Sequence, residues 1–359
     1  MTRAGKSRSL AAVPVLFLSA CGLLPPSTPD TSPAAPPRAS APHGQAYPQL
    51  LARAGEFRAL LSEQQRAQLH QPYTFENAAR WHTYPQADLH EDGRLGLDLG
   101  TLSEQQWESL HVLLATAMGS APNQGADQLR QHLIADDHLH SIGAGDAYGR
   151  GHFRLAFLGE PSETGLWQLQ FGGHHTAVTN TYRDGRLIGA TPSFRAIEPR
   201  APFEYQGTTY EPEGEELRAF QAMLGSLTQN QKDAAELRSG HLLLGPGNDW
   251  KFPDRREGVP VASLDAGQRD LVIAAIRTYV GDVDDVSAAA IMAKYERELD
   301  ATHIAWSGST ALNDTGDYVR IDGPSLWLEL QLEGGWSTDE PHPHSVWRDR
   351  VTDYGGTRP

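Results

Sequence analysis

Cysteine is almost missing from this sequence of 359 residues, and a single one stands at position 21. One cysteine excludes a disulfide within the chain. Basic patches interleaved with aromatic residues are also missing, so nucleic acid is not an expected partner. No apolar run approaches the roughly 20 residues that a helix needs to cross a bilayer. These absences leave a globular protein with a core of its own.

Acidic residues outnumber basic ones, with 45 Asp and Glu against 30 Lys and Arg, for a formal net charge of −15. A surface of this sign attracts cations. Charged and apolar residues are mixed along the chain and eight tryptophans are present, which is typical of a folded protein and not of a disordered one. The length allows one large domain or two coupled ones.

The first residues have the pattern of an export signal. Arg3, Lys6 and Arg8 form a basic region, residues 11–18 form a short apolar run, and Leu18-Ser19-Ala20-Cys21 matches a bacterial lipoprotein cleavage box. In such a box the cysteine becomes the lipidated first residue of the mature protein. An ordinary signal peptide, or a short apolar run that occurs by chance, is the alternative.

We therefore expect a lipoprotein signal peptide over residues 1–20 and lipidation of Cys21. Residues 21–46 are rich in Pro, Ser and Thr, which predicts a stiff, solvated tether between the lipid and the domain. The expected location is the bacterial cell envelope, on the extracytoplasmic side, with the membrane as a partner through the lipid anchor.

Periodicity predicts helices followed by strands in the first part of the domain. Apolar residues recur at helical spacing over 50–69, where a second helix starts at Ser62, and over 101–118, and a further helix is expected over 127–137. Ser62 and Ser103 are each followed three residues later by glutamine, the pattern of a capping box. Residues 152–190 alternate as strands do, with a hairpin turn at Asp184-Gly185.

The same order then repeats. Residues 220–231 match the first helix start, residues 263–279 and 286–299 predict two further helices, and residues 318–321 and 326–332 predict strands. The clearest match pairs Leu166-Trp167 with Leu326-Trp327, 160 residues later. The pattern predicts an α+β fold that is internally duplicated, with amphipathic helices packed on antiparallel β-sheets. Chance similarity of amphipathic helices is the alternative. The expected pseudo-symmetric halves are residues 47–204 and 205–359, combined in one globular domain.

Histidines follow the tryptophan-bearing strand in each half. Side chains alternate along a strand, so His342 and His344 should face one side, and His174 and His175 should face opposite sides. One of the latter pair could then join the former two. Three imidazoles from two halves suit a divalent transition metal, Zn, Cu or Fe, with a position left open. We expect a ring nitrogen of His174 or His175 within roughly 4–5 Å of one from His342 or His344.

Other residues are candidates for the surroundings of this site. Glu333, Asp339 and Asp349 are possible oxygen ligands or hydrogen-bond partners. His303 could line the same cleft or pack on Trp306. Arg348 and Asp349, beside Trp347, could clamp a ligand carboxylate or form a simple ion pair. The alternative is that the histidines bind no metal and only make hydrogen bonds that stabilise the fold, because no helical metal-binding signature is present.

Four motifs together resemble the domain of unknown function 3500 family, whose members are secreted or lipid-anchored proteins, mainly of bacteria. The motifs are Phe171-Gly-Gly-His174-His175, His303-x-Ala305-Trp306-x-Gly308, Tyr318-x-Arg320-Ile321-x-Gly323-Pro324-Ser325 and His342-x-His344-Ser-Val-Trp-Arg-Asp349. The resemblance runs from about Tyr47 to Tyr354. It implies export and the place of the site, and it implies no reaction. Gly173 and the acidic segment Glu333–Glu340 depart from the family pattern.

The function that the sequence favours is an extracytoplasmic lipoprotein with a histidine-rich metal site, as a hydrolytic or oxidative enzyme. A non-catalytic lipoprotein that binds a metal or a small-molecule ligand is the alternative, and a structural protein of the envelope is a third. Enzymatic activity itself is left open by the sequence.

Overall fold

Helices and strands form where the sequence supplies caps and apolar periodicity. The structure, a computed structural model, describes residues 46–85, 93–335 and 337–358. The predicted signal peptide, Cys21 and nearly all of the predicted tether lie outside these residues. The α-helices are α1 Ala46–Leu60, α2 Glu63–Leu69, α3 Phe75–Ala78, α4 Glu104–Ala117, α5 Gly125–Ser141, α6 Gly214–Ser226, α7 Gln229–Ala235, α8 Ala266–Val280 and α9 Asp285–Arg297. In this part of the chain, none of the helices has the length and apolar character that a bilayer span requires.

Four helices begin at a capping box, in which an N-cap side chain accepts from the third helical N–H and a glutamine side chain accepts from the N-cap N–H. The pairs are Ser62 with Gln65, Ser103 with Gln106, Thr228 with Gln231, and Asp265 with Gln268. The predicted helix starts at Ser62 and Ser103 are confirmed. The helix expected over 127–137 is longer, because α5 continues to Ser141.

The strands are β1 His70–Gln71, β2 Leu97–Asp98, β3 Arg154–Leu158, β4 Leu166–Gly173, β5 Thr176–Arg183, β6 Arg186–Gly189, β7 Ser193–Ala196, β8 Phe203–Tyr205, β9 Thr208–Tyr210, β10 Val259–Pro260, β11 His303–Ser307, β12 Tyr318–Asp322, β13 Leu326–Glu333 and β14 His342–Asp349. Twelve of them form one sheet, with the order β1-β3-β4-β5-β7-β14-β13-β12-β11-β10, while β2 pairs with β3 and β6 with β5. The strands β8 and β9 form a separate hairpin.

The fold class is α+β, as predicted, but the expected separate antiparallel sheets are joined into one. The short strand β7 lies between β5 and β14, where Arg195 pairs with Thr176 on one side and with Ser345 on the other. No strand edge is therefore left between the two predicted halves. The sheet is mixed, because β1 pairs with β3 in parallel while the other pairs are antiparallel.

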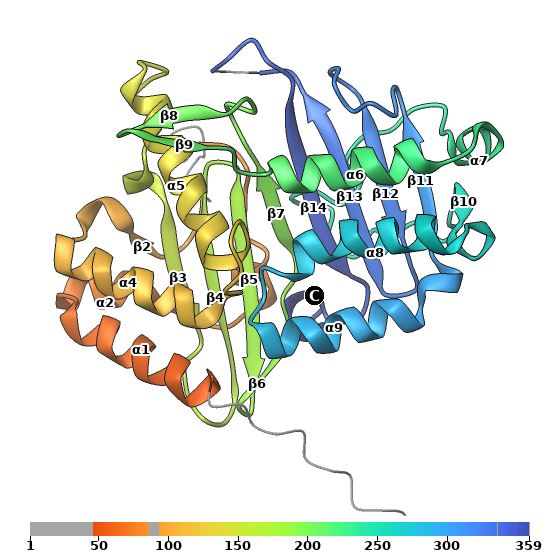
Figure 1. Ribbon diagram of the computed structural model, residues 1–359. Helices are drawn as coiled ribbons and strands as arrows, with labels where there is room; N and C mark the ends of the chain where they lie inside the picture. The colour runs from red at the N-terminus through yellow and green to blue at the C-terminus, as the bar shows by residue number, and fades with distance from the viewer. Residues whose placement is uncertain (1–45, 86–92, 336, 359) are drawn as a thin grey trace, which may run out of the picture. The chain divides into compact units, whose positions relative to one another are not determined.

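Helices α1, α4 and α5 and helices α6, α8 and α9 lie on the same face of this sheet (Figure 1). Alternate strand residues such as Leu169 and Phe171, or Leu328 and Leu330, point to the helices and form two apolar cores with them. The opposite face carries a third core that includes Trp81, Phe194 and Val346. The helical layer and the second layer of irregular chain together bury the central strands on both faces.

The same kind of contact occurs once in each predicted half, where it links the glutamines of two capping boxes. Gln106 donates to the carbonyl of Leu60 and to the side chain of Gln65, at 2.9 and 3.0 Å. Gln268 likewise donates to the carbonyl of Ser226 and to Gln231, at 2.9 and 2.8 Å. These matching contacts agree with an internal duplication, which stays a prediction.

Candidate metal centre

The first histidine element is the two-residue turn between β4 and β5. His174 and His175 form this turn, and the φ angle of His175 is +60°, in the left-handed region. The expectation that the two side chains face opposite sides of a strand is wrong, because alternation ends where the strand ends. Their rings instead stack, with centroids 3.7 Å apart.

The second element lies on β14, where the expected alternation holds. The Nε2 atoms of His342 and His344 are 2.8 Å apart, so both rings face one side of the strand. Pro343 between them does not break the strand, and its carbonyl accepts a hydrogen bond from the N–H of Ile197.

The turn and the strand meet at the joint between β5, β7 and β14. His175, His342 and His344 each offer a ring nitrogen, and these three atoms lie within 4.8 Å of one another. The ring centroid of His175 is 5.0 Å from that of His342 and 4.8 Å from that of His344. The three side chains are 9, 2 and 8 % exposed. This is the one group of three or more metal-binding side chains at such spacing in the described part of the protein.

Several nitrogens of this histidine group lack partners in the protein. Both ring nitrogens of His175 and the Nδ1 of His342 are buried with no hydrogen bond. Burying a polar atom without a partner is unfavourable, and such atoms in a folded protein usually bind something. A cation between the rings would bind one of the two nitrogens of His175, because each imidazole offers one ligand atom to an ion.

Burial favours the neutral form of these imidazoles. It lowers the pKa of His175 and of His344 well below the usual histidine value, and the neighbouring histidines lower both pKa values further. Burial also lowers the pKa of His342, although the charge of Glu198 acts in the opposite direction. Neutral imidazole is the form that binds a metal ion.

Two carboxylates lie against the histidines. The Nδ1 of His344 is 3.5 Å from the carboxylate of Glu333, whose pKa is raised by burial. A proton held on Nδ1 by this contact leaves the lone pair of Nε2 facing His342. His174 is outside the group of three, and its Nδ1 is 2.7 Å from Asp136 on α5.

A buried polar network behind the turn was missed in the sequence. His132 on α5 contacts Thr176 through Nδ1, at 2.9 Å, and Glu213 through Nε2, at 3.0 Å. Arg195 pairs with Glu216 and Asp282, each at 3.0 Å. The signal on α5 was present, because Gln128, His132 and Asp136 are spaced by four residues and so share one helix face. Their partners are set by tertiary packing, and they are His174 in the turn, Thr176 on β5, and Glu213 and Glu216 at the start of α6.

The other predicted site residues lie elsewhere. Asp349 is at the far end of β14, five residues from His344 or about 16 Å along a strand, and it binds Lys294 and Tyr295, at 2.6 and 2.8 Å. Trp347 donates to Tyr295. Arg348 points to the opposite face, where it is fully buried between Asp353 and Asp249, at 2.7 Å each. Arg348 and Asp349 therefore form neither a mutual ion pair nor a clamp at the histidines.

His303 and Trp306 are also outside the centre. They lie on β11, which is separated from β14 by two strands, or about 14 Å at the usual spacing. Three residues apart on a strand, they face opposite sides, so His303 does not pack on Trp306 either. Trp306 donates to the carbonyl of Lys232. Asp339 is exposed, and it makes no described contact with the histidines.

Comparison with known proteins identifies the family and nothing closer. No curated protein and no solved structure matches this chain. A family model described as "Protein of unknown function (DUF3500)" matches residues 43–356, which include the turn at His174-His175 and the whole of β14. The chain therefore belongs to the DUF3500 family of proteins of unknown function.

Proposed function

We propose that this protein is a metal-dependent enzyme of the cell envelope, with His175, His342 and His344 as ligands of one divalent transition metal. The observation that carries the proposal is the convergence of three buried imidazoles, one of which has no other partner for either ring nitrogen. Zn, Cu and Fe are the ions that imidazole ligands suit.

The spacing needs a small adjustment to hold an ion. Two nitrogens at about 2.1 Å from one zinc ion are about 3.4 Å apart in a tetrahedral arrangement. The 2.8 Å between the Nε2 atoms of His342 and His344 would therefore open slightly. His175 would move closer, and rotation of its ring breaks no hydrogen bond among the described residues.

Three protein ligands favour catalysis over a purely structural role. Structural zinc sites are almost always closed by four protein ligands, whereas catalytic sites use three and leave one position for water or substrate. A bound ion would act as a Lewis acid and lower the pKa of a coordinated water. The protein itself would supply orientation, through Glu333 at His344 and through the hairpin turn at His175.

A non-catalytic metal site is the second candidate, and the burial of the three side chains favours it. A site that substrate cannot reach would hold the metal for stability or for delivery. Of the two, the enzyme is the better supported, because no fourth histidine, cysteine or carboxylate completes the group in the described residues.

Metal analysis of the untagged, purified protein tests the proposal. We expect about one Zn, Cu or Fe per chain, or tight binding of one such ion by the metal-free protein. Cobalt substitution then separates the two candidates, because azide changes the visible spectrum of cobalt with an open position and leaves a closed site unchanged. A protein that neither contains nor binds a transition metal would refute both candidates.

A further inference from the structure

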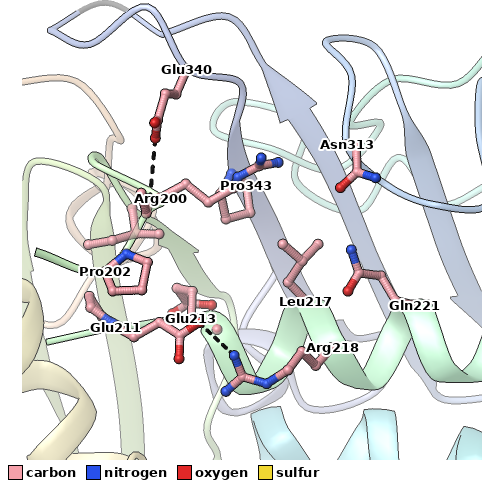
Figure 2. Close-up of a pocket in the computed structure, with 14 residues that line it drawn as sticks. Arg200, Pro202, Glu211, Glu213, Leu217, Arg218, Gln221, Asn313, Glu340 and Pro343 are labelled. Atoms are coloured by element: carbon pink, nitrogen blue, oxygen red, sulfur yellow. Dashed lines mark hydrogen bonds and ion pairs between the residues drawn. The ribbon is translucent and has the colours of Figure 1, made fainter.

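A pocket of about 280 Å³ lies on the helical face of the sheet, against the first turns of α6. Its walls come from the segment after β7, from the β9–α6 connection and from the start of β14 (Figure 2). Pro343 lines it, while His342 and His344 face the opposite side of β14, because strand side chains alternate. The pocket is therefore separate from the histidine centre, and it is close to the usual lower limit of ligand sites.

Arg200 has no partner in this pocket. Its Nη1 is buried and makes no hydrogen bond, and none of the described carboxylates forms an ion pair with its guanidinium. Figure 2 shows the side chain reaching across the pocket beside Pro343, towards the side where Asn313 and Gln221 lie. A buried guanidinium nitrogen of this kind calls for an acceptor.

Three of the other four charged groups of the pocket, Glu211, Glu213 and Arg218, are paired with an opposite charge. Arg218 pairs with Glu211 at 2.6 Å. Glu213 at the floor contacts His132 at 3.0 Å and lies 3.7 Å from Arg195. The exposed Glu340 accepts from the backbone N–H of Ala201, at 3.4 Å, and forms no described ion pair with the guanidinium of Arg200 (Figure 2). Among the described residues, Arg200 is thus the cation of this pocket without a counter-ion, and Glu340 is its carboxylate without one.

The start of α6 adds to this preference. Its N-cap residue, Glu213, has a φ of +60° and makes no side-chain cap. The side chain that could have capped the helix is turned to His132 instead. The first-turn N–H groups of this 13-residue helix carry a positive partial charge, which favours a bound anion and is offset in part by the carboxylates of Glu215 and Glu216 in the same turn.

We propose that this pocket binds a small oxyanion, carboxylate or phosphate, through the guanidinium of Arg200. A planar guanidinium forms paired hydrogen bonds with either group, and the pocket volume limits the ligand to the size of a small metabolite. Binding at this site does not require a metal at the histidine centre.

Calorimetric titration of the metal-free protein at low salt tests this site, with inorganic phosphate and acetate as probes and acetamide as the uncharged control. We expect one of the two anions to bind and acetamide not to bind, and the tighter anion identifies the class. Arg200→Gln should weaken binding by at least about tenfold. Arg200→Lys keeps the positive charge but cannot form the paired hydrogen bonds of a guanidinium. It should weaken binding by a smaller factor than Arg200→Gln.

The matched control is Arg186→Gln, which removes the same charge from an exposed position in the β5–β6 hairpin. It should change the affinity less than twofold, and circular dichroism checks that every variant is folded. If neither anion binds the unaltered protein, or if both glutamine variants weaken binding equally, the Arg200 site is refuted. Neither outcome bears on metal binding, so the two proposals fail separately.

Discussion

The Nε2 atoms of His342 and His344 lie 2.8 Å apart inside the protein. Two neutral imidazoles can face each other at this distance when a proton or a cation lies between the nitrogens. Because burial lowers both pKa values, a second proton is disfavoured there. One shared proton, or one metal ion in its place, fits this spacing.

Replacing either residue should abolish the metal binding that we propose. We expect His342→Ala and His344→Ala each to lower metal affinity by at least about hundredfold, since even residues that support a ligand change affinity by about 10–100-fold. The measurement is metal content after dialysis against a weak chelator. His303→Ala is the control, because that histidine lies on β11, and it should retain the metal. Equal loss in all three variants would point to a general effect on folding.

A side chain at Gly173, the residue before the turn that carries His175, should destabilise the protein. A Cβ at Gly173 would lie 2.2 Å from the ring of the buried Phe153, so Gly173→Ala must displace that ring or the turn. Crowding of this kind costs about 1–3 kcal/mol, to be measured by urea unfolding. The control is Gly55→Ala in α1, where a Cβ meets nothing and a stabilising effect of up to about 1 kcal/mol is expected. An unchanged free energy of unfolding for Gly173→Ala would contradict the close contact.

Local rules predicted much of this fold. The caps at Ser62 and Ser103 depend on contacts three residues apart, and the shared face of His342 and His344 follows from strand alternation. The same alternation failed at His174-His175, because these residues form a turn and a turn has no two-residue period. The alternation ends with β4 at Gly173.

Long-range pairing decided the rest. The strand β7 is four residues long, and its sequence, Ser-Phe-Arg-Ala, has no signal that places it between β5 and β14. Its Arg195 is nevertheless the cation to which α6 and the segment after α8 bring carboxylates. The polar stripe on α5 was readable at i, i+4 spacing, but its partner Glu213 is 81 residues away.

Glu216 should make stability depend on pH. Burial raises its pKa well above the usual value, and the charge of Glu213 raises it further. A raised pKa means that the folded protein holds this proton more tightly than the unfolded chain. The contribution is thus favourable below the unfolded pKa of about 4.3, and it is lost as pH rises towards the folded pKa.

Glu216→Gln keeps the oxygen that accepts from Arg195 and removes the titration. Relative to the unaltered protein, the variant should gain stability between pH 5 and pH 8 in chemical unfolding. A tenfold difference in proton affinity between the folded and unfolded chain corresponds to about 1.4 kcal/mol of stability. A constant difference between the two proteins over this range would show that Glu216 does not titrate differently on folding.

The predicted lipid anchor depends on one residue. Cys21→Ser should leave a precursor that is unprocessed or a product that is soluble, because lipid transfer needs the thiol. Membrane fractionation and the mass of the N-terminal peptide measure both effects. Cys21 is the single cysteine of the chain, so no other thiol can replace it. A variant that is cleaved at the same position and stays in the membrane would contradict the lipoprotein assignment.

The paired glutamines give the sharpest test of equivalence between the halves. Gln106 and Gln268 are nearly buried, and each satisfies an N-cap N–H, a helix-end carbonyl and a second glutamine. Alanine would leave these groups without partners, at a cost of about 1–3 kcal/mol. We expect Gln106→Ala and Gln268→Ala to lower the free energy of unfolding by similar amounts. Gln105→Ala, in the same helix but exposed, should have little effect. If one variant lost much of its free energy of unfolding and the other lost none, the matching contacts would differ in energy. The structural argument for duplication would then be weakened.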